Sequence, residues 1–130
     1  MGTTASDAIV LLAHGARDPD WARPFEAIKA RIESRLPHAR VALAFLELMP
    51  PPLDVAVEAL VEDGARTVHV VPVFMAQGGH VKRDVPLILD ALRARHPDVT
   101  IVLTPAAGEA ESVTAAIADW VTGLVRVPPA

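Results

Sequence analysis

The sequence contains no cysteine. This absence excludes disulfide bonds, thiolate metal sites, iron–sulfur clusters and a cysteine nucleophile. Any metal that the chain handles must therefore be bound through nitrogen or oxygen atoms. Aromatic residues are also scarce, at 4% of the 130 residues, so we expect a core built from Val, Leu, Ile and Ala.

Long apolar runs and a strong excess of one charge are lacking too. The longest apolar stretches reach about half the length of a membrane span. Residues 1–7 lack the basic and apolar regions of a signal peptide, so we expect a cytoplasmic protein without a membrane partner. The net charge of −4 argues against a nucleic-acid partner.

A length of 130 residues fits one ordinary domain. A chain of this size buries about two-thirds of its unfolded surface, which is enough to fold without covalent crosslinks. We predict a single domain over residues 1–130, with residues 1–7 and 126–130 frayed. No internal repeat, linker or low-complexity segment interrupts it.

Four short apolar runs predict buried strands, and amphipathic segments between and after them predict helices. The runs cover residues 8–13, 41–46, 68–73 and 99–103. Apolar residues recur at helical spacing in three segments, as Phe25, Ile28, Ile32 and Leu36; Leu53, Val57, Leu60 and Val61; and Val113, Ile117, Trp120, Val121 and Leu124. A further helix is predicted to begin at Asp84 as N-cap, with Pro86 in its first turn.

Strands that alternate with helices predict right-handed βαβ units on a parallel sheet. The expected fold class is α/β, with three layers and a four-stranded parallel sheet of order 2-1-3-4, as in flavodoxin-like folds.

Three polar residues follow three of the predicted strands. The first strand runs directly into His14, the second into Glu47, and the loop after the third carries His80. Ligands of such sheets bind beyond the carboxyl ends of the strands, at the point where the connections diverge. The first and third strands flank this point, so we expect His14 and His80 to face each other.

Two imidazoles and a carboxylate suit Fe²⁺, Co²⁺, Ni²⁺ or Zn²⁺, and they form an open site rather than a closed structural one. Each residue alone also fits a structural role: His14 as a strand cap, His80 as a cover for a helix start and Glu47 as a solvated charge. Their joint placement favours a functional site. His38, His69 and His96 are interpreted as structural, since they lie in a loop, inside the third strand and at a helix end.

At these residues the chain resembles the CbiX/SirB family of class II chelatases, which insert cobalt or iron into sirohydrochlorin. The resemblance covers nearly the whole chain. The matching stretches are residues 11–19 around His14, residues 44–50 around Glu47, and residues 71–74 and 78–86 around His80. Ala16 departs from the family pattern, in which Ser is frequent, and this costs a hydroxyl but no ligand.

The resemblance implies that His14 and His80 bind the metal, and that Glu47 assists as ligand or base. It implies a lyase-class enzyme of cobalamin or siroheme biosynthesis, with no cofactor besides its divalent metal substrate, Co²⁺, Fe²⁺ or Ni²⁺. Longer members look like two fused copies, so a short form is expected to be a homodimer.

Arg17, Lys82 and Arg83 lie near His14 and His80 in the sequence. We expect them to recognise a carboxylate-rich macrocycle, because an acidic protein needs local positive charge to bind an anion. Gly78 and Gly79 would let the backbone approach a large flat ligand closely.

The sequence speaks against two other functions and leaves a third open. A histidine phosphatase would need an arginine before His14–Gly15 to clamp phosphate, and Ala13 stands there. A receiver-like module would need paired acidic residues after the first strand to hold Mg²⁺. A non-catalytic metal or tetrapyrrole carrier needs the same open site as an enzyme, so this alternative stays open.

Overall fold

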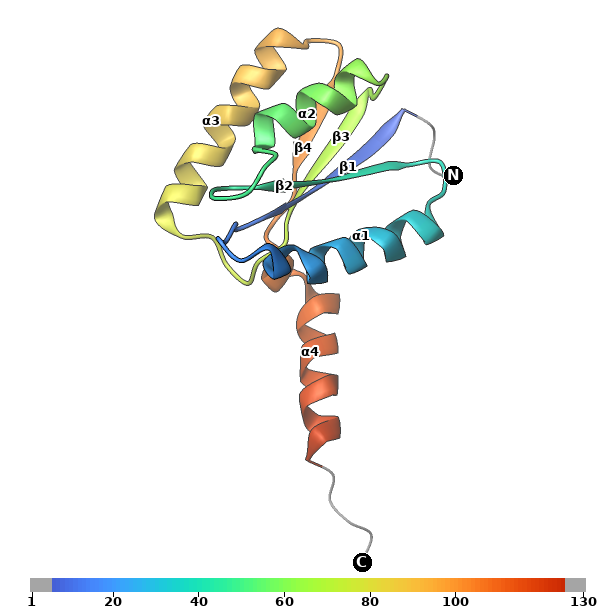
Figure 1. Cartoon of the computed structure of the whole chain (residues 1–130), viewed down its shortest axis with the longest axis vertical. Helices are drawn as coiled ribbons and strands as arrows, with labels where there is room; N and C mark the ends of the chain where they lie inside the picture. Colours follow the sequence, from blue (N-terminus) through green and yellow to red (C-terminus); the bar gives the residue numbers. More distant parts are fainter. Residues whose placement is uncertain (1–5, 126–130) are drawn as a thin grey trace, which may run out of the picture.

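A computed structural model describes residues 6–125 of the chain (Figure 1). Within this range, four strands form one parallel sheet of order β2-β1-β3-β4. The strands are β1 (Asp7–Ala13), β2 (Arg40–Phe45), β3 (Thr67–Pro72) and β4 (Thr100–Leu103). The predicted fold class and strand order are therefore confirmed.

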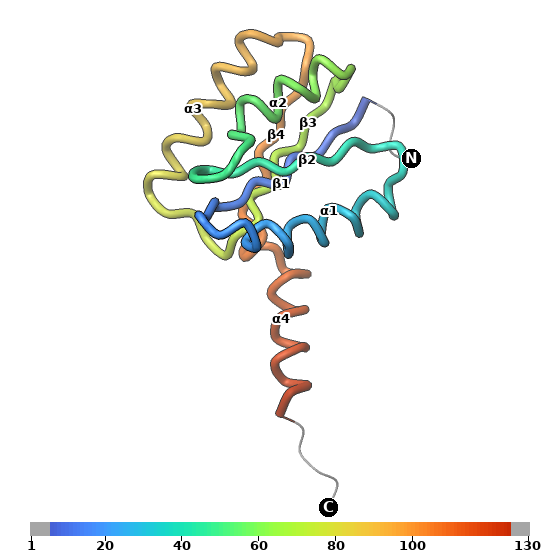
Figure 2. The backbone as a smooth tube through the Cα atoms, viewed as in Figure 1, coloured from blue at the N-terminus to red at the C-terminus, as the bar shows by residue number. Residues whose placement is uncertain are grey.

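The helices are α1 (Arg23–Arg35), α2 (Leu53–Glu62), α3 (Gly79–Arg95) and α4 (Glu111–Leu124). Two 3₁₀ turns, η1 (Pro19–Ala22) and η2 (Ala107–Glu109), precede α1 and α4. Figures 1 and 2 show α2 and α3 on one face of the sheet and α1 on the other, while α4 projects away from the body. No helix between residues 6 and 125 is long and apolar enough to cross a membrane.

The main core lies between the sheet and the pair α2 and α3. Alternate residues of the central strands face it, because side chains of a strand point to opposite faces in turn. Val10, Leu12, Val68 and Val70 are fully buried there. In the pairing register Val10 stands beside Val70, so the two central strands present one continuous apolar surface to these helices.

The start of the third helix was predicted wrongly. The helix begins at Gly79, with Gly78 in an extended conformation before it, so Pro86 lies inside the helix rather than in its first turn. A proline there cannot donate the usual backbone hydrogen bond. Its neighbours Val85 and Leu89 are buried against the core, and we infer that this burial outweighs the missing bond.

The predicted fraying of the amino terminus is wrong for its last two residues. The carbonyl of Ser6 accepts hydrogen bonds from the backbone amides of Arg66 and Thr67 at 2.8 and 3.2 Å. Asp7 begins β1 and pairs with Thr67. Backbone pairing to β3 therefore holds this end. The remaining residues predicted to fray, 1–5 and 126–130, lie outside the described range, and the single domain over 1–130 stays a prediction.

Candidate functional site

A cavity of about 500 Å³ opens at the carboxyl ends of β1, β2 and β3. It is lined by His14, Leu46, Glu47, Gly78, Gly79, His80 and Val81. His14 directly follows β1, Glu47 lies two residues beyond β2, and His80 is the second residue of α3. The parallel sheet thus brings the three predicted metal-handling residues, far apart in sequence, to one cavity.

His14 is held from two sides. Its ring lies against that of Phe74, with centroids 4.8 Å apart and planes inclined by 42°. Its backbone carbonyl accepts a hydrogen bond from the indole Nε1 of Trp21, at 2.6 Å. The side chain is half-buried, whereas Glu47 and His80 are exposed. His14 is therefore the most firmly placed of the three.

The loop carrying Glu47 crosses the loop after His14 at very close range. A Cβ atom added to Gly15 would overlap the backbone carbonyl of Glu47, so only glycine permits this crossing. The next residue, Leu48, has a left-handed φ of 65°, and the amide of Met49 bonds back to the Glu47 carbonyl at 2.8 Å. This tight turn fixes the backbone of Glu47 beside that of His14.

His80 has a side-chain partner one helical turn away. A guanidinium nitrogen of Arg83 lies 3.0 Å from Nδ1 of His80. Because arginine can only donate, Nδ1 must accept, and a neutral imidazole then carries its proton on Nε2. In this arrangement neither ring nitrogen offers a free lone pair to a metal ion.

The other predicted site residues fall into two groups. Gly78 and Gly79 line the cavity, and an added Cβ would meet nothing within 4 Å, so neither glycine is required by crowding in this structure. Arg17, Lys82 and Arg83 are exposed and do not line the cavity. Lys82 and Arg83 belong to the first turns of α3, because the helix begins earlier than predicted.

The three candidate ligands share a cavity without forming a closed cluster. Across residues 6–125, no group of three or more His, Asp or Glu side chains is arranged to hold a metal ion. His14, Glu47 and His80 therefore line one open cavity, and in this structure they do not form a closed metal site.

Sequence reasoning missed Phe74 and Trp21, the two contacts of His14. Phe74 was visible only as one residue of the loop after β3, and no local pattern pairs it with His14. The remaining histidines lie where the sequence places them. His38 is in an exposed turn, His69 is half-buried in β3, and Nε2 of His96, at the end of α3, lies 2.9 Å from Oε2 of Glu58.

A family model described as CbiX matches residues 8–123. The match takes in all four strands except the first residue of β1, and nearly all of α4, and it includes His14, Glu47 and His80. The chain belongs to the CbiX family.

Individual CbiX relatives are similar over most of this chain. A sirohydrochlorin cobaltochelatase of Methanopyrus kandleri is 39% identical over 82 residues, which are 63% of this chain and 57% of that protein. A solved structure described as a CbiX protein of cobalamin biosynthesis, from Marinobacter aquaeolei, is 36% identical with a TM-score of 0.77, covering 91% of this chain and 96% of that one.

A second solved structure contains a metal. It is the sirohydrochlorin chelatase SirB of Bacillus subtilis subspecies spizizenii in complex with cobalt, 25% identical with a TM-score of 0.76. The structural match covers 92% of this chain and 51% of the SirB chain. This chain thus spans about half of SirB and 57% of the Methanopyrus relative, but nearly all of the Marinobacter protein.

Proposed function

We propose that this CbiX protein is a sirohydrochlorin chelatase, which inserts Co²⁺ or Fe²⁺ into a carboxylate-rich tetrapyrrole. The observation that carries the proposal is the single cavity lined by His14, Glu47 and His80 at the carboxyl ends of three strands. The names of the relatives and the cobalt bound to SirB support the same reaction class.

In this proposal the metal ion is a substrate, and His14 and His80 hold it on one side while the macrocycle approaches from the other. Imidazole nitrogens bind these ions well enough to capture them, yet an open set of ligands lets the ion leave. His14, fixed by Phe74 and Trp21, is the stationary ligand.

His80 is the adjustable ligand. Its Nδ1 must give up the hydrogen bond from Arg83 before it presents a lone pair to the ion. The arginine so released is free to bind a carboxylate of the macrocycle. Arrival of the tetrapyrrole would thereby make His80 available for metal transfer at the moment when a second substrate is present.

Glu47 is proposed to assist by accepting protons. The pyrrole nitrogens lose their protons when the ion enters the ring, and these protons must pass to a nearby base or to water. Glu47 lines the same cavity as both histidines and is exposed to solvent, so its carboxylate can relay a proton outward.

An absorbance assay tests the proposal. Sirohydrochlorin is mixed with Co²⁺, Fe²⁺ or Ni²⁺ in parallel, and the conversion of its spectrum is followed with and without protein. We expect many turnovers per subunit for at least one ion. Stoichiometric binding without turnover would favour the carrier alternative and contradict the enzyme assignment. The pathway served and the cytoplasmic location stay predictions.

A further inference from the structure

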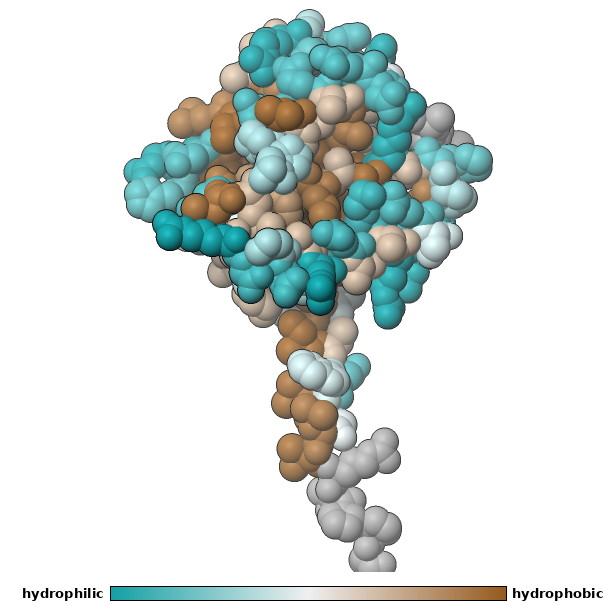
Figure 3. Space-filling view, in the orientation of Figure 1, coloured by the Kyte–Doolittle hydropathy of each residue, from teal (hydrophilic) through white to brown (hydrophobic). Residues whose placement is uncertain are grey.

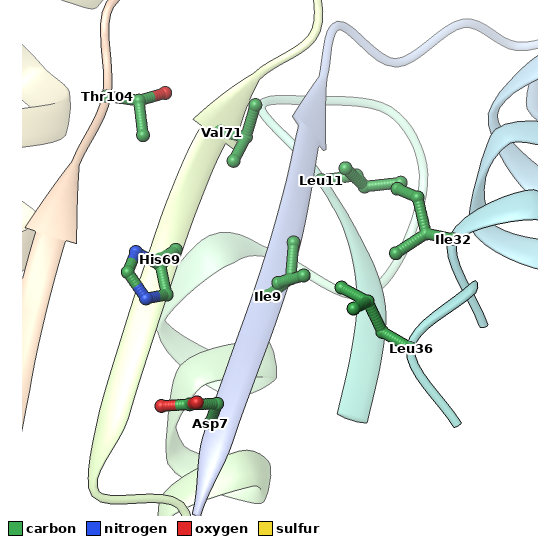
Figure 4. Close-up of a pocket in the computed structure, with 8 residues that line it drawn as sticks. All are labelled: Asp7, Ile9, Leu11, Ile32, Leu36, His69, Val71 and Thr104. Atoms are coloured by element: carbon green, nitrogen blue, oxygen red, sulfur yellow. The ribbon is translucent and has the colours of Figure 1, made fainter. Parts of the chain in front are cut away.

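The chain after β4 crosses the loop after β3 close to the candidate site. The two strands end side by side, since the amide of Thr104 donates a hydrogen bond to the carbonyl of Val70 at 3.0 Å. Figure 4 shows Thr104 and Val71 at these strand ends, where they line one pocket. Beyond them one segment leads through Phe74 to α3, and the other leads through η2 to α4. The two segments therefore leave the sheet as neighbours.

Gly108 in η2 brings the two segments into very close contact. Its amide donates a hydrogen bond to the carbonyl of Phe74 at 3.1 Å. A Cβ atom added to Gly108 would overlap the carbonyl oxygen and the Cα atom of Met75. The φ of Gly108 is not left-handed, so other residues could adopt this backbone conformation, and it is the crowding that requires glycine. At this crossing, backbone lies directly against backbone.

The turn η2 is itself held against the body of the protein. Ala106, the residue before it, is fully buried, and its backbone amide donates a hydrogen bond to the carboxylate of Glu109 at 3.0 Å. The amide of Glu109 donates in return to the carbonyl of Ala106 at 2.9 Å. The helix α4 adds no such anchor, because none of its residues is buried and its apolar side chains lie exposed where it projects from the body (Figure 3). The turn η2 is therefore the fixed side of the crossing.

On the other side of the crossing, the loop after β3 carries the ring that touches His14. The centroids of the Phe74 and His14 rings lie 4.8 Å apart. The hydrogen bond from Trp21 reaches the backbone carbonyl of His14, so it does not fix the rotation of the imidazole. Among residues 6–125, no hydrogen bond joins a ring nitrogen of His14 to another residue. Contact with Phe74 therefore sets the orientation of the imidazole without occupying its nitrogens.

We propose that Gly108 is a positioning residue of the chelatase site. By letting η2 lie against the backbone of Phe74 and Met75, it keeps the Phe74 ring on His14 and so directs the imidazole that lines the cavity. Neither Gly108 nor Phe74 lines that cavity, so both act through His14 rather than on the reactants. The inference rests on the proposed function, because it takes His14 as a metal ligand.

Proton NMR of the His14 imidazole tests the positioning directly. The nearby Phe74 ring shifts the ring-proton signals of His14, and Phe74→Leu removes this shift while keeping an apolar side chain. The His14 signals are those that disappear in His14→Ala. Gly108→Ala should move them toward their position in Phe74→Leu, since the added Cβ forces the loop and η2 apart. Gly123→Ala is the matched control, because an added Cβ there meets nothing within 4 Å, and it should leave the signals in place.

The kinetics of metal insertion test whether this positioning serves the reaction. Gly108→Ala should lower kcat by about tenfold or more, because moving a reacting group by about 1 Å can cost up to about a hundredfold. Phe74→Leu should lower kcat as well. Gly108→Ala should then add little in the Phe74→Leu background, since two residues that act through one contact do not give additive effects. Equal losses in both backgrounds would show that Gly108 does not act through Phe74, and they overturn the proposal. Unmoved His14 signals in folded Gly108→Ala protein overturn it too.

A second variant covers the case in which Gly108→Ala does not fold, as checked by far-ultraviolet circular dichroism. Glu109→Ala removes the carboxylate that holds the amide of Ala106, and the protein should still fold because Glu109 is exposed. Its His14 signals should move in the same direction by a smaller amount, and unmoved signals contradict the proposal equally. The NMR measurement needs no turnover. A protein that inserts no metal therefore contradicts the proposed function, while the His14 signals still decide whether Gly108 positions His14.

Discussion

Arg83 donates a hydrogen bond to Nδ1 of His80 across one turn of α3, at 3.0 Å. The contact joins a residue expected to bind substrate to a residue expected to bind metal. It arises because α3 starts at Gly79, which places the two side chains three positions apart on one helix face.

Arg83→Ala is expected to strengthen binding of Co²⁺ to the free protein, because Nδ1 of His80 no longer accepts from the guanidinium. The gain should be at most about tenfold, since such a hydrogen bond contributes about 1 kcal/mol net. Isothermal titration measures the affinity, and ¹⁵N NMR of the imidazole reports the tautomer. Lys82→Ala is the control, since it removes a neighbouring positive charge without touching His80. Equal gains in Co²⁺ affinity in both variants would show that the loss of a positive charge, and not the freed Nδ1 of His80, causes the effect.

His14→Ala and His80→Ala should each lower kcat for metal insertion by about a hundredfold or more, as is typical when a group that acts on the reacting atoms is lost. Both should keep the fold, because neither side chain is fully buried. His38→Ala, in an exposed turn, serves as the control and should retain full activity. Near-normal turnover of His80→Ala would remove it from the proposed ligand set.

Glu47→Gln preserves the size of the side chain and removes its negative charge. If the carboxylate accepts pyrrole protons, kcat should fall by about a hundredfold while KM for the tetrapyrrole changes little. Steady-state assays over a range of pH measure both constants. Full activity at every pH would show that Glu47 is an ordinary loop residue.

The sheet and the meeting of the three candidate residues at one edge could be predicted from the sequence for a physical reason. A buried parallel strand needs a continuous apolar run, and residues 8–13 and 68–73 are such runs. Once the strands are placed in parallel, their carboxyl ends meet at one edge. His14, Glu47 and His80 therefore had to lie near one another, and one cavity contains all three.

Contacts between distant segments could not be predicted in this way. Asp84 and Pro86 carry local signals of a helix start, but α3 begins at Gly79, and Val81 in the added turn packs against the core. The contact of Phe74 with His14 has no local signal at all. The period of α4 indicates an apolar stripe but not the surface that covers it.

Gly15→Ala is expected to damage both stability and activity. Its Cβ would overlap the Glu47 carbonyl, so the two loops must separate, at a cost of about 1–3 kcal/mol. Urea denaturation gives the free energy of unfolding, and the insertion assay gives kcat. Gly64→Ala is the comparison: Gly64 has φ +104° and no close neighbour, so the variant should lose about 1 kcal/mol yet keep its activity. Unchanged activity of Gly15→Ala would show that the spacing of His14 and Glu47 is not critical.

Lys82 and Arg83 should raise the affinity for an anionic macrocycle although they do not line the cavity. Both are exposed beside it, on the first turns of α3, and the whole chain carries a net charge of −4 that repels such a ligand. The double variant Lys82→Ala, Arg83→Ala is expected to raise KM for sirohydrochlorin more than it lowers kcat, the pattern of lost uniform binding. Added salt should raise KM of the wild-type protein as well, because the Debye length falls to about 8 Å near physiological ionic strength.

The control is the double variant Arg31→Ala, Arg35→Ala. It removes the same charge from the far end of α1 and should leave KM for sirohydrochlorin almost unchanged. If both double variants shift KM equally, net charge rather than local recognition attracts the tetrapyrrole. If KM responds neither to salt nor to the first double variant, these residues are solvated surface charges.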